Sequence, residues 1–228
     1  MIGIFDSGVG GLASYNEARR LLPGEDIIYL ADSKNAPYGT KDRNTIIKLV
    51  KNNLRILKNR GAQKILIACC TASSIHSSLT KEEREISVPI ILPAAHEALS
   101  AGHRIVTVST DYTAASHAFR DEITELCRRA TVTEIPAQIL VGLVECGARD
   151  GGLLPREAEI IDNICEKVRS HSPDALILGC THFSHLAGEF ESRLPGTKIV
   201  NAAVIGARVL AESIKLSKSS GNGKTIYI

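Results

Sequence analysis

The chain has 228 residues, 44% hydrophobic and 23% charged, which is enough for one large or two small globular domains with an apolar core. Its 27 basic and 25 acidic residues are evenly spread, which argues against nucleic acid as a partner. No apolar run approaches the ~18 residues that cross a bilayer, and "MIGIFDSGVGG" is no signal peptide, so we expect a cytoplasmic protein without membrane contact.

Short apolar, β-rich runs alternate with helical segments along the chain. In chain order, the expected strands are Ile2–Phe5, Asp26–Leu30, Lys64–Ala68, Val88–Leu92, Arg104–Val108, Thr131–Ile135, Ala175–Leu178 and Lys198–Val200, with "TIYI" as a last edge strand. Helical spacing predicts helices over Asn44–Asn59, Thr113–Arg129, Arg156–Ser170 and Ala202–Ser217. Apolar strands separated by helices are typical of parallel sheets covered on both faces, so we predict an α/β fold.

The stretch "PIILPAAHEALS" contains the expected boundary between two units, near Pro93. We predict a first α/β domain made of residues 1–92 plus 198–228, and a second made of 93–197. The similar segments "ILIACCTASS" and "LILGCTHFSH" would then lie one in each unit, half a chain apart. This spacing is consistent with a pseudo-duplicated architecture.

Small polar residues follow four of the expected strands, in "IGIFDSGVGG", "IIYLADSKNAPYGT", "ILIACCTASS" and "LILGCTHFSH". Ligands of open parallel sheets bind beyond the carboxyl ends of the strands, where helix starts favour an anion. We therefore expect a carboxylate or phosphate ligand there. The candidate donors are the hydroxyls of Ser7, Thr71, Thr113 and Thr181 and the backbone amides of Tyr38–Gly39.

Three of the six cysteines, Cys69, Cys70 and Cys180, lie at strand-to-helix turns. A helix N-terminus lowers the pKa of a thiol and favours the reactive thiolate. Two thiols in matching positions after strands indicate a chemical role rather than a role as side chains of the core. One thiolate would remove a proton from a carbon acid while the opposite thiol protonates the other face, which inverts a stereocentre. His182 or Asp6 would tune a thiol or polarise an ammonium group, although His182 could equally cap a helix.

A zinc site is an alternative for Cys69, Cys70, Cys180 and His182. Adjacent cysteines rarely both reach one ion, and structural zinc prefers C-x₂₋₄-C spacing, so we expect no metal. A disulfide is disfavoured in a reducing compartment.

A dinucleotide-dependent oxidoreductase is a second alternative, because Gly8, Gly10 and Ala13 fit the pattern G-x-G-x-x-A. Against it, the carboxylate of Asp6 precedes the glycines and would repel a pyrophosphate.

Four motifs, "IGIFDSGVGGL", "ADSKNAPYGTK", "IACCTAS" and "LILGCTHF", together resemble the cofactor-independent glutamate racemases of the aspartate/glutamate racemase superfamily. The resemblance extends over nearly the whole chain. It implies two pseudo-symmetric α/β domains with mainly parallel sheets and an active site in the cleft between them. It also implies interconversion of L- and D-glutamate for peptidoglycan synthesis, without pyridoxal phosphate or metal, and a homodimer as a possible assembly.

The resemblance carries residue roles over by position. It implies that Cys69 and Cys180 are the catalytic thiols, assisted by Asp6, His182 and Glu145. The substrate-contacting positions that it implies are Asp6, Ser7, Pro37, Tyr38, Gly39, Cys70, Thr71, Thr113, Thr181 and His182.

The chain departs from the family pattern at several places. Cys70 replaces the usual Asn, "CTHFSHL" replaces a Tyr-Pro pair, "AQILVGLVE" lacks the usual cysteine and prolines, and the sequence ends at "IYI". A thiol is a weaker hydrogen-bonding group than an amide. We therefore keep two further hypotheses open: a racemase of another amino acid such as aspartate, and a catalytically weakened member that binds an acidic ligand.

Overall fold

The computed structural model describes residues 1–146, 153–217 and 222–228, whose strands form two sheets. The first sheet, in the order β4-β3-β1-β2-β9, contains β1 (Ile2–Asp6), β2 (Ile27–Ala31), β3 (Lys64–Ile67), β4 (Ser87–Pro89) and β9 (Thr225–Tyr227). The second, in the order β6-β5-β7-β8, contains β5 (Arg104–Ser109), β6 (Thr131–Pro136), β7 (Ala175–Gly179) and β8 (Lys198–Asn201). Neighbouring strands are parallel in every described pair, which confirms the predicted α/β class.

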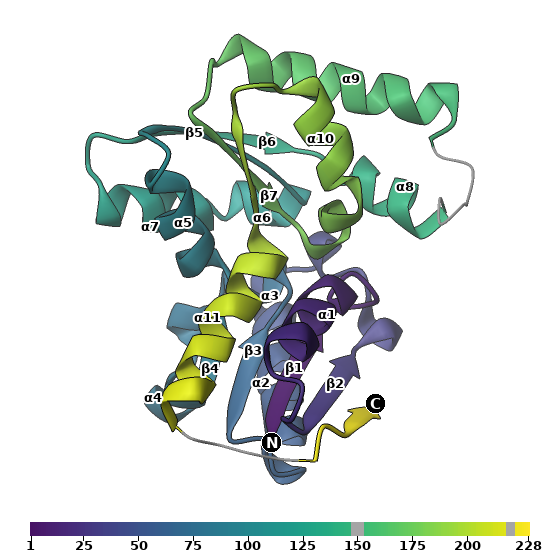
Figure 1. Cartoon of the computed structure of the whole chain (residues 1–228), viewed down its shortest axis with the longest axis vertical. Helices are drawn as coiled ribbons and strands as arrows, with labels where there is room; N and C mark the ends of the chain where they lie inside the picture. Colours follow the sequence, from purple (N-terminus) through teal and green to yellow (C-terminus); the bar gives the residue numbers. More distant parts are fainter. Residues whose placement is uncertain (147–152, 218–221) are drawn as a thin grey trace.

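Helices flank both sheets, and each sheet forms one lobe with its helices. The two lobes lie one below the other in Figure 1. The first lobe holds the first sheet with α1 (Leu12–Leu21), η1 (Ser33–Asn35), η2 (Tyr38–Thr40), α2 (Arg43–Asn59), α3 (Cys70–Ser73), η3 (His76–Ser78) and α4 (Lys81–Ile86). The second lobe holds the second sheet with α5 (Ile91–Leu99), α6 (Asp111–Ala115), α7 (Ala118–Leu126), α8 (Ile139–Cys146), α9 (Pro155–Ser170), η4 (Thr181–Leu186) and α10 (Ala187–Arg193). Helix α11 (Ala202–Ser217) packs on both lobes, against α1 in the first and α5 and η4 in the second.

Burial of the central strands fixes the positions of their carboxyl ends. All residues of β1 and β7 are buried. Helix α2 covers one face of the first sheet with a buried stripe at helical spacing that includes Ile46, Val50 and Leu54. Each such side chain contributes about 1.5–3 kcal/mol when fully buried. The loops after the strands are therefore held by a rigid scaffold.

Two elements differ from the sequence prediction. The strand expected over Val88–Leu92 ends at Pro89, and α5 begins at Ile91, with Pro93 in its first turn, where a missing N–H costs no helical hydrogen bond. The helix expected over Thr113–Arg129 is broken between α6 and α7 by His117, which has a left-handed backbone (φ 55°).

Strand β8 lies with the second sheet and not with the first. It pairs in parallel with β7, Lys198 opposite Ala175, because its apolar residues Ile199 and Val200 pack in the core there. The prediction that grouped residues 198–228 with the first domain is therefore wrong for β8. The rest of the predicted division into two domains stays a prediction. The expected edge strand at the end of the chain is confirmed as β9, which pairs with β2.

Among the helices of the described residues, none has the length and apolar character that crossing a membrane requires.

Candidate active site

The carboxyl ends of strands from both sheets enclose one small cavity. Its walls are Ser7, Pro37, Tyr38, Gly39, Cys69, Cys70, Thr71, Thr110, Gln138, Val141, Cys180, Thr181 and His182. These residues follow β1, β2 and β3 of the first sheet and β5, β6 and β7 of the second. The cavity has a volume of about 20 Å³, room for about one water molecule.

Cys69 enters the cavity from the first lobe at the start of α3. Its Sγ accepts a hydrogen bond from the N–H of Ala72 (3.4 Å) and donates one to Oγ of Ser7 (3.5 Å). Burial, and next the charge of Asp6, raise the pKa of this thiol to about 11, although the bonds to Ser7 and Ala72 oppose the rise. The expectation that the helix start lowers this pKa is therefore wrong, because loss of solvent outweighs the helix dipole.

Cys180 enters from the second lobe at the start of η4, and is buried like Cys69 (8% and 5% exposed). Its Sγ lies 3.8 Å from Nδ1 of His182, whose Nε2 lies 3.2 Å from Oε1 of Glu145. Burial, and then the neighbouring charge of Cys69, raise the pKa of Cys180. Cys180, His182 and Glu145 thus form a chain of groups along which a proton can move.

Asp6 is fully buried behind the cavity wall and ties the lobes together. One carboxylate oxygen accepts from the N–H of Gly8 (2.9 Å) and the other from the hydroxyl of Thr181 (3.1 Å). Burial raises the pKa of Asp6, while the charge of His182 and the bond from Gly8 oppose this rise.

The glycine loop after β1 packs against the second lobe. A Cβ on Gly10 would lie 2.6 Å from Oγ1 of Thr181 and 2.7 Å from Nδ1 of His182. The backbone of Gly10 therefore lies against Thr181 and His182 at the place where a dinucleotide fold would hold a pyrophosphate. The N–H of Gly8 is already hydrogen-bonded to the carboxylate of Asp6. Both observations weigh against the oxidoreductase hypothesis.

Three threonine hydroxyls form a closed triangle between α3 and α6. Oγ1 of Thr71 lies 3.0 Å from those of Thr110 and Thr113, which are themselves 2.9 Å apart. The hydroxyl of Tyr38, another lining residue, donates to Asp32 and accepts from Asn53 (2.9 Å). These bonds fix parts of the cavity wall.

Cys70 lines the cavity and also packs in the apolar core. Burial, followed by the nearby charges of Cys180 and Cys69, raises its pKa well above the usual range. Within residues 1–146, 153–217 and 222–228, no group of three or more His, Cys, Asp or Glu side chains is arranged to hold a metal ion.

The structure gathers the predicted site residues in and around this cavity. Asp6, Thr113 and Glu145 lie behind its walls, bonded to the lining residues Thr181, Thr71 and His182 respectively. The other predicted residues line it: Ser7, Pro37, Tyr38, Gly39, Cys69, Cys70, Thr71, Cys180, Thr181 and His182. Their individual roles remain predictions.

Sequence reasoning missed three lining residues, Thr110, Gln138 and Val141. Thr110 directly follows β5, so the rule of polar residues at strand ends could have found it. Gln138 follows β6 by two residues, which makes that signal weak. Val141, an apolar residue on a helix, gives no chemical signal at all.

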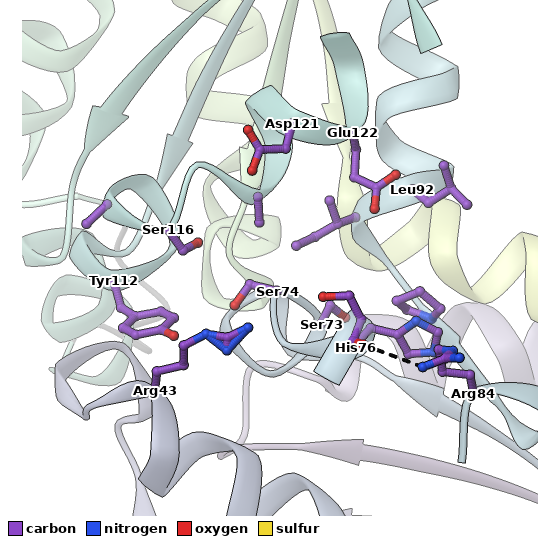
Figure 2. A pocket seen from close by; sticks show the side chains of 15 residues that line it. Arg43, Ser73, Ser74, His76, Arg84, Leu92, Tyr112, Ser116, Asp121 and Glu122 are labelled. Carbon is purple, nitrogen blue, oxygen red and sulfur yellow. Dashed lines mark hydrogen bonds between the residues drawn. The ribbon is translucent and has the colours of Figure 1, made fainter. Parts of the chain in front are cut away.

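A second cavity, of about 860 Å³, lies on the other side of α3 and α6. Figure 2 shows Arg43 and Tyr112 on one side of it, His76 and Arg84 on the other. No described cysteine lines it, so it is not the place for thiol chemistry. Helix α3 separates the two cavities, since Thr71 faces the small one and Ser74 the large one.

Two parallel-sheet lobes with one cavity between them, lined by a buried thiol from each lobe, fit the class of α/β isomerases that racemise amino acids. The family model described as Asp/Glu/Hydantoin racemase matches residues 11–210, and the chain belongs to this family.

Relatives support this assignment in sequence and in structure. The glutamate racemase of Microcystis aeruginosa is 33% identical over 94% of this chain and 76% of its own length. A crystal structure of a glutamate racemase from Bacillus anthracis superposes with a TM-score of 0.90 at 25% identity, covering 100% of this chain and 86% of that one. The Francisella tularensis enzyme in complex with D-glutamate gives a TM-score of 0.89 at 26% identity, covering 99% and 86%. An aspartate racemase from Picrophilus torridus, at 17% identity, shares the fold.

Proposed function

We propose that this protein interconverts L- and D-glutamate, with Cys69 and Cys180 as the two groups that transfer protons. One observation carries the proposal: a buried thiol from each lobe lines the same cavity. A carbon held between two such thiols has one acid/base group on each face, which is what inversion at Cα requires.

In the reaction that we propose, one cysteine as thiolate takes the Cα proton, and the opposite thiol gives its proton to the other face. The roles of the two thiols exchange in the reverse direction. Both thiols have pKa values raised by burial in the closed cavity. The substrate's ammonium group brings a positive charge that favours a thiolate. For Cys180, the nearby Nδ1 of His182 can accept the thiol proton.

Helix starts and hydroxyl groups of the site would stabilise the negative charge that develops at Cα and its carboxylate. In this proposal Ser7, which bonds Cys69, meets the ammonium group, and the charge of Asp6 behind the cavity wall favours that group beside Cys69. We assign the reaction no cofactor, because the thiols and the closed site supply the proton transfers and the electrostatic stabilisation.

The choice of glutamate rests on the relatives, which are named glutamate racemases and include a complex with D-glutamate. We further propose that the D-glutamate formed serves peptidoglycan synthesis in the cytoplasm, where reducing conditions keep thiols free. A homodimer is part of this proposal, and light scattering of the purified protein tests it.

Replacing either thiol tests the mechanism. In heavy water without added cofactor, we expect the wild-type protein to exchange the Cα proton of glutamate and to racemise it. Cys69→Ala and Cys180→Ala should each lower the racemisation rate about 10²- to 10⁴-fold, since each removes the acid/base group of one face. Cys127→Ala, at a half-buried position outside the cavity, is the control. Racemisation that survives either catalytic-site substitution unchanged would contradict the mechanism.

A substrate panel separates this proposal from the two hypotheses that Cys70 raises. Faster turnover of aspartate than of glutamate would indicate the other substrate. Thermal stabilisation by glutamate without any exchange or turnover would indicate a binding protein that has lost its activity.

A further inference from the structure

Gln138 has a buried oxygen without a partner at the cavity wall. It lies in the turn between β6 and α8. Its side-chain Oε1 has no hydrogen-bond partner in the part of the chain that the structure describes. Two other such atoms, on Thr107 and Glu134, lie away from the described cavities, so Gln138 alone combines this feature with the site.

The amide oxygen lies close to the backbone of Gly39 in the first lobe. A Cβ on Gly39, in the first lobe, would lie 2.7 Å from Oε1 of Gln138 and 2.9 Å from Cβ of Thr110. The absence of a side chain at Gly39 leaves room for both the Gln138 amide and Thr110, so the amide lies against the first lobe at Gly39. A buried amide oxygen without a hydrogen-bond partner destabilises the protein. A carboxylate, which only accepts, would pair with this group once the amide has turned over and its NH₂ group stands where Oε1 now lies.

The described lining residues contain no lysine or arginine to meet an acidic ligand. The hydroxyls that line the cavity are partly engaged: Thr71 and Thr110 bond each other, and Thr181 donates to Asp6. Gln138 carries the one side-chain amide among these lining residues. An amide offers two N–H donors, and a half-turn about its last torsion exchanges its oxygen and its NH₂ group.

We infer that Gln138 is a specificity-determining residue whose NH₂ group donates hydrogen bonds to a carboxylate of the bound acidic amino acid. The inference rests on the proposed function. Asp6 and Ser7 lie near Cys69 and suit the ammonium group, whereas Gln138 lies at the Gly39–Thr110 side and suits a carboxylate. The amide of Gln138, in the second lobe, thereby binds the same ligand as residues of the first lobe.

Two substitutions of similar length test this assignment. Gln138→Met removes the donors and keeps an unbranched side chain, and we expect KM for glutamate to rise about 10- to 100-fold while kcat changes less, as for a lost hydrogen bond to a charged group. Gln138→Glu replaces the donors by a second negative charge and should raise KM further. Gln63→Met is the matched control, because Gln63 is exposed and does not line the cavity.

Thermal stabilisation by glutamate gives a second readout that needs no turnover. Folding of each variant is checked by circular dichroism, and Gln138→Asn serves if Gln138→Met does not fold. A Gln138→Met protein with unchanged KM and unchanged stabilisation by glutamate would overturn the inference. Wild-type affinity in Gln138→Glu would overturn the carboxylate assignment and point to the ammonium group. A wild-type protein that neither binds nor turns over glutamate would defeat the proposed function and this inference together.

Discussion

The thiol of Cys69 makes stability depend on pH in the alkaline range. Its pKa rises from 9.0 to about 11 on folding, chiefly by burial. The folded protein therefore holds this proton more tightly than the unfolded chain does. The resulting contribution is complete below pH 9 and is lost as the pH rises through about 11.

We therefore expect wild-type protein to lose about 2 to 3 kcal/mol of unfolding free energy through this one group between pH 9 and 11. Cys69→Ser lacks this titrating group, so its stability should fall less steeply. Urea unfolding at pH 7.5 and pH 11 measures the change for both proteins, and the difference isolates Cys69 from the other alkaline groups. Equal slopes for the two proteins would rule out the raised pKa.

At the residue scale, the sequence predicts those features that obey a regular pattern. Cys69 and Cys180 are predictable because each comes directly after an apolar strand whose end must lie at the ligand-binding edge. The direction in which their pKa values shift is not predictable from the sequence, because it depends on how completely the other lobe covers the two thiols. Gln138 is not predicted from the sequence for a related reason, because its place at the site depends on its closeness to Gly39, which is far away in the sequence.

At the scale of elements, Gly206 determines how closely α11 approaches the start of α5. A Cβ on Gly206 would lie 2.2 Å from Cγ2 and 2.9 Å from Cβ of Ile90, so Ile90 or the helix must move. Overpacking of this kind costs about 1–3 kcal/mol, and the higher helix propensity of alanine offsets about 1 kcal/mol of it.

Gly206→Ala should therefore lower the free energy of unfolding by up to about 2 kcal/mol, although alanine is the better helix former. Gly142→Ala is the matched control: Gly142 lies in the middle of α8, is exposed, and has no atom within 4 Å of the added Cβ. It should stabilise the protein by about 0.5–1 kcal/mol. Denaturant unfolding measures both, and a stabilising Gly206→Ala would disprove the close contact.

Element positions can be predicted from the sequence where one local signal dominates. The alternation of apolar strands and helices predicts both sheets. The end of β4 and the start of α5 are missed because "VPIILP" has the apolar residues of a strand, while its prolines limit the strand and suit a helix start. The place of β8 is missed because sheet partners are chosen by tertiary packing and not by the strand's own residues.

For the whole molecule, the size of the active-site cavity requires motion. Room for about one water molecule (about 20 Å³) cannot hold an amino acid. The walls come from both lobes, and contacts such as that of Gly10 with Thr181 and His182 hold them together. Substrate must therefore enter while the lobes are further apart, or while the loops that line the cavity have moved.

The reactivity of the thiols reports this opening. In ligand-free protein, iodoacetamide should label the exposed Cys146 quickly and Cys69 and Cys180 slowly, because the reagent reaches the two buried thiols only when the cavity opens. Saturating glutamate should slow labelling of Cys69 and Cys180 further and leave Cys146 unchanged, since a bound ligand occupies the space between the lobes. Mass spectrometry of the digested protein follows each cysteine separately. Labelling of Cys69 as fast as that of Cys146 would show that the cavity is open without ligand. Labelling of Cys69 that is insensitive to glutamate would show that glutamate does not bind between the lobes.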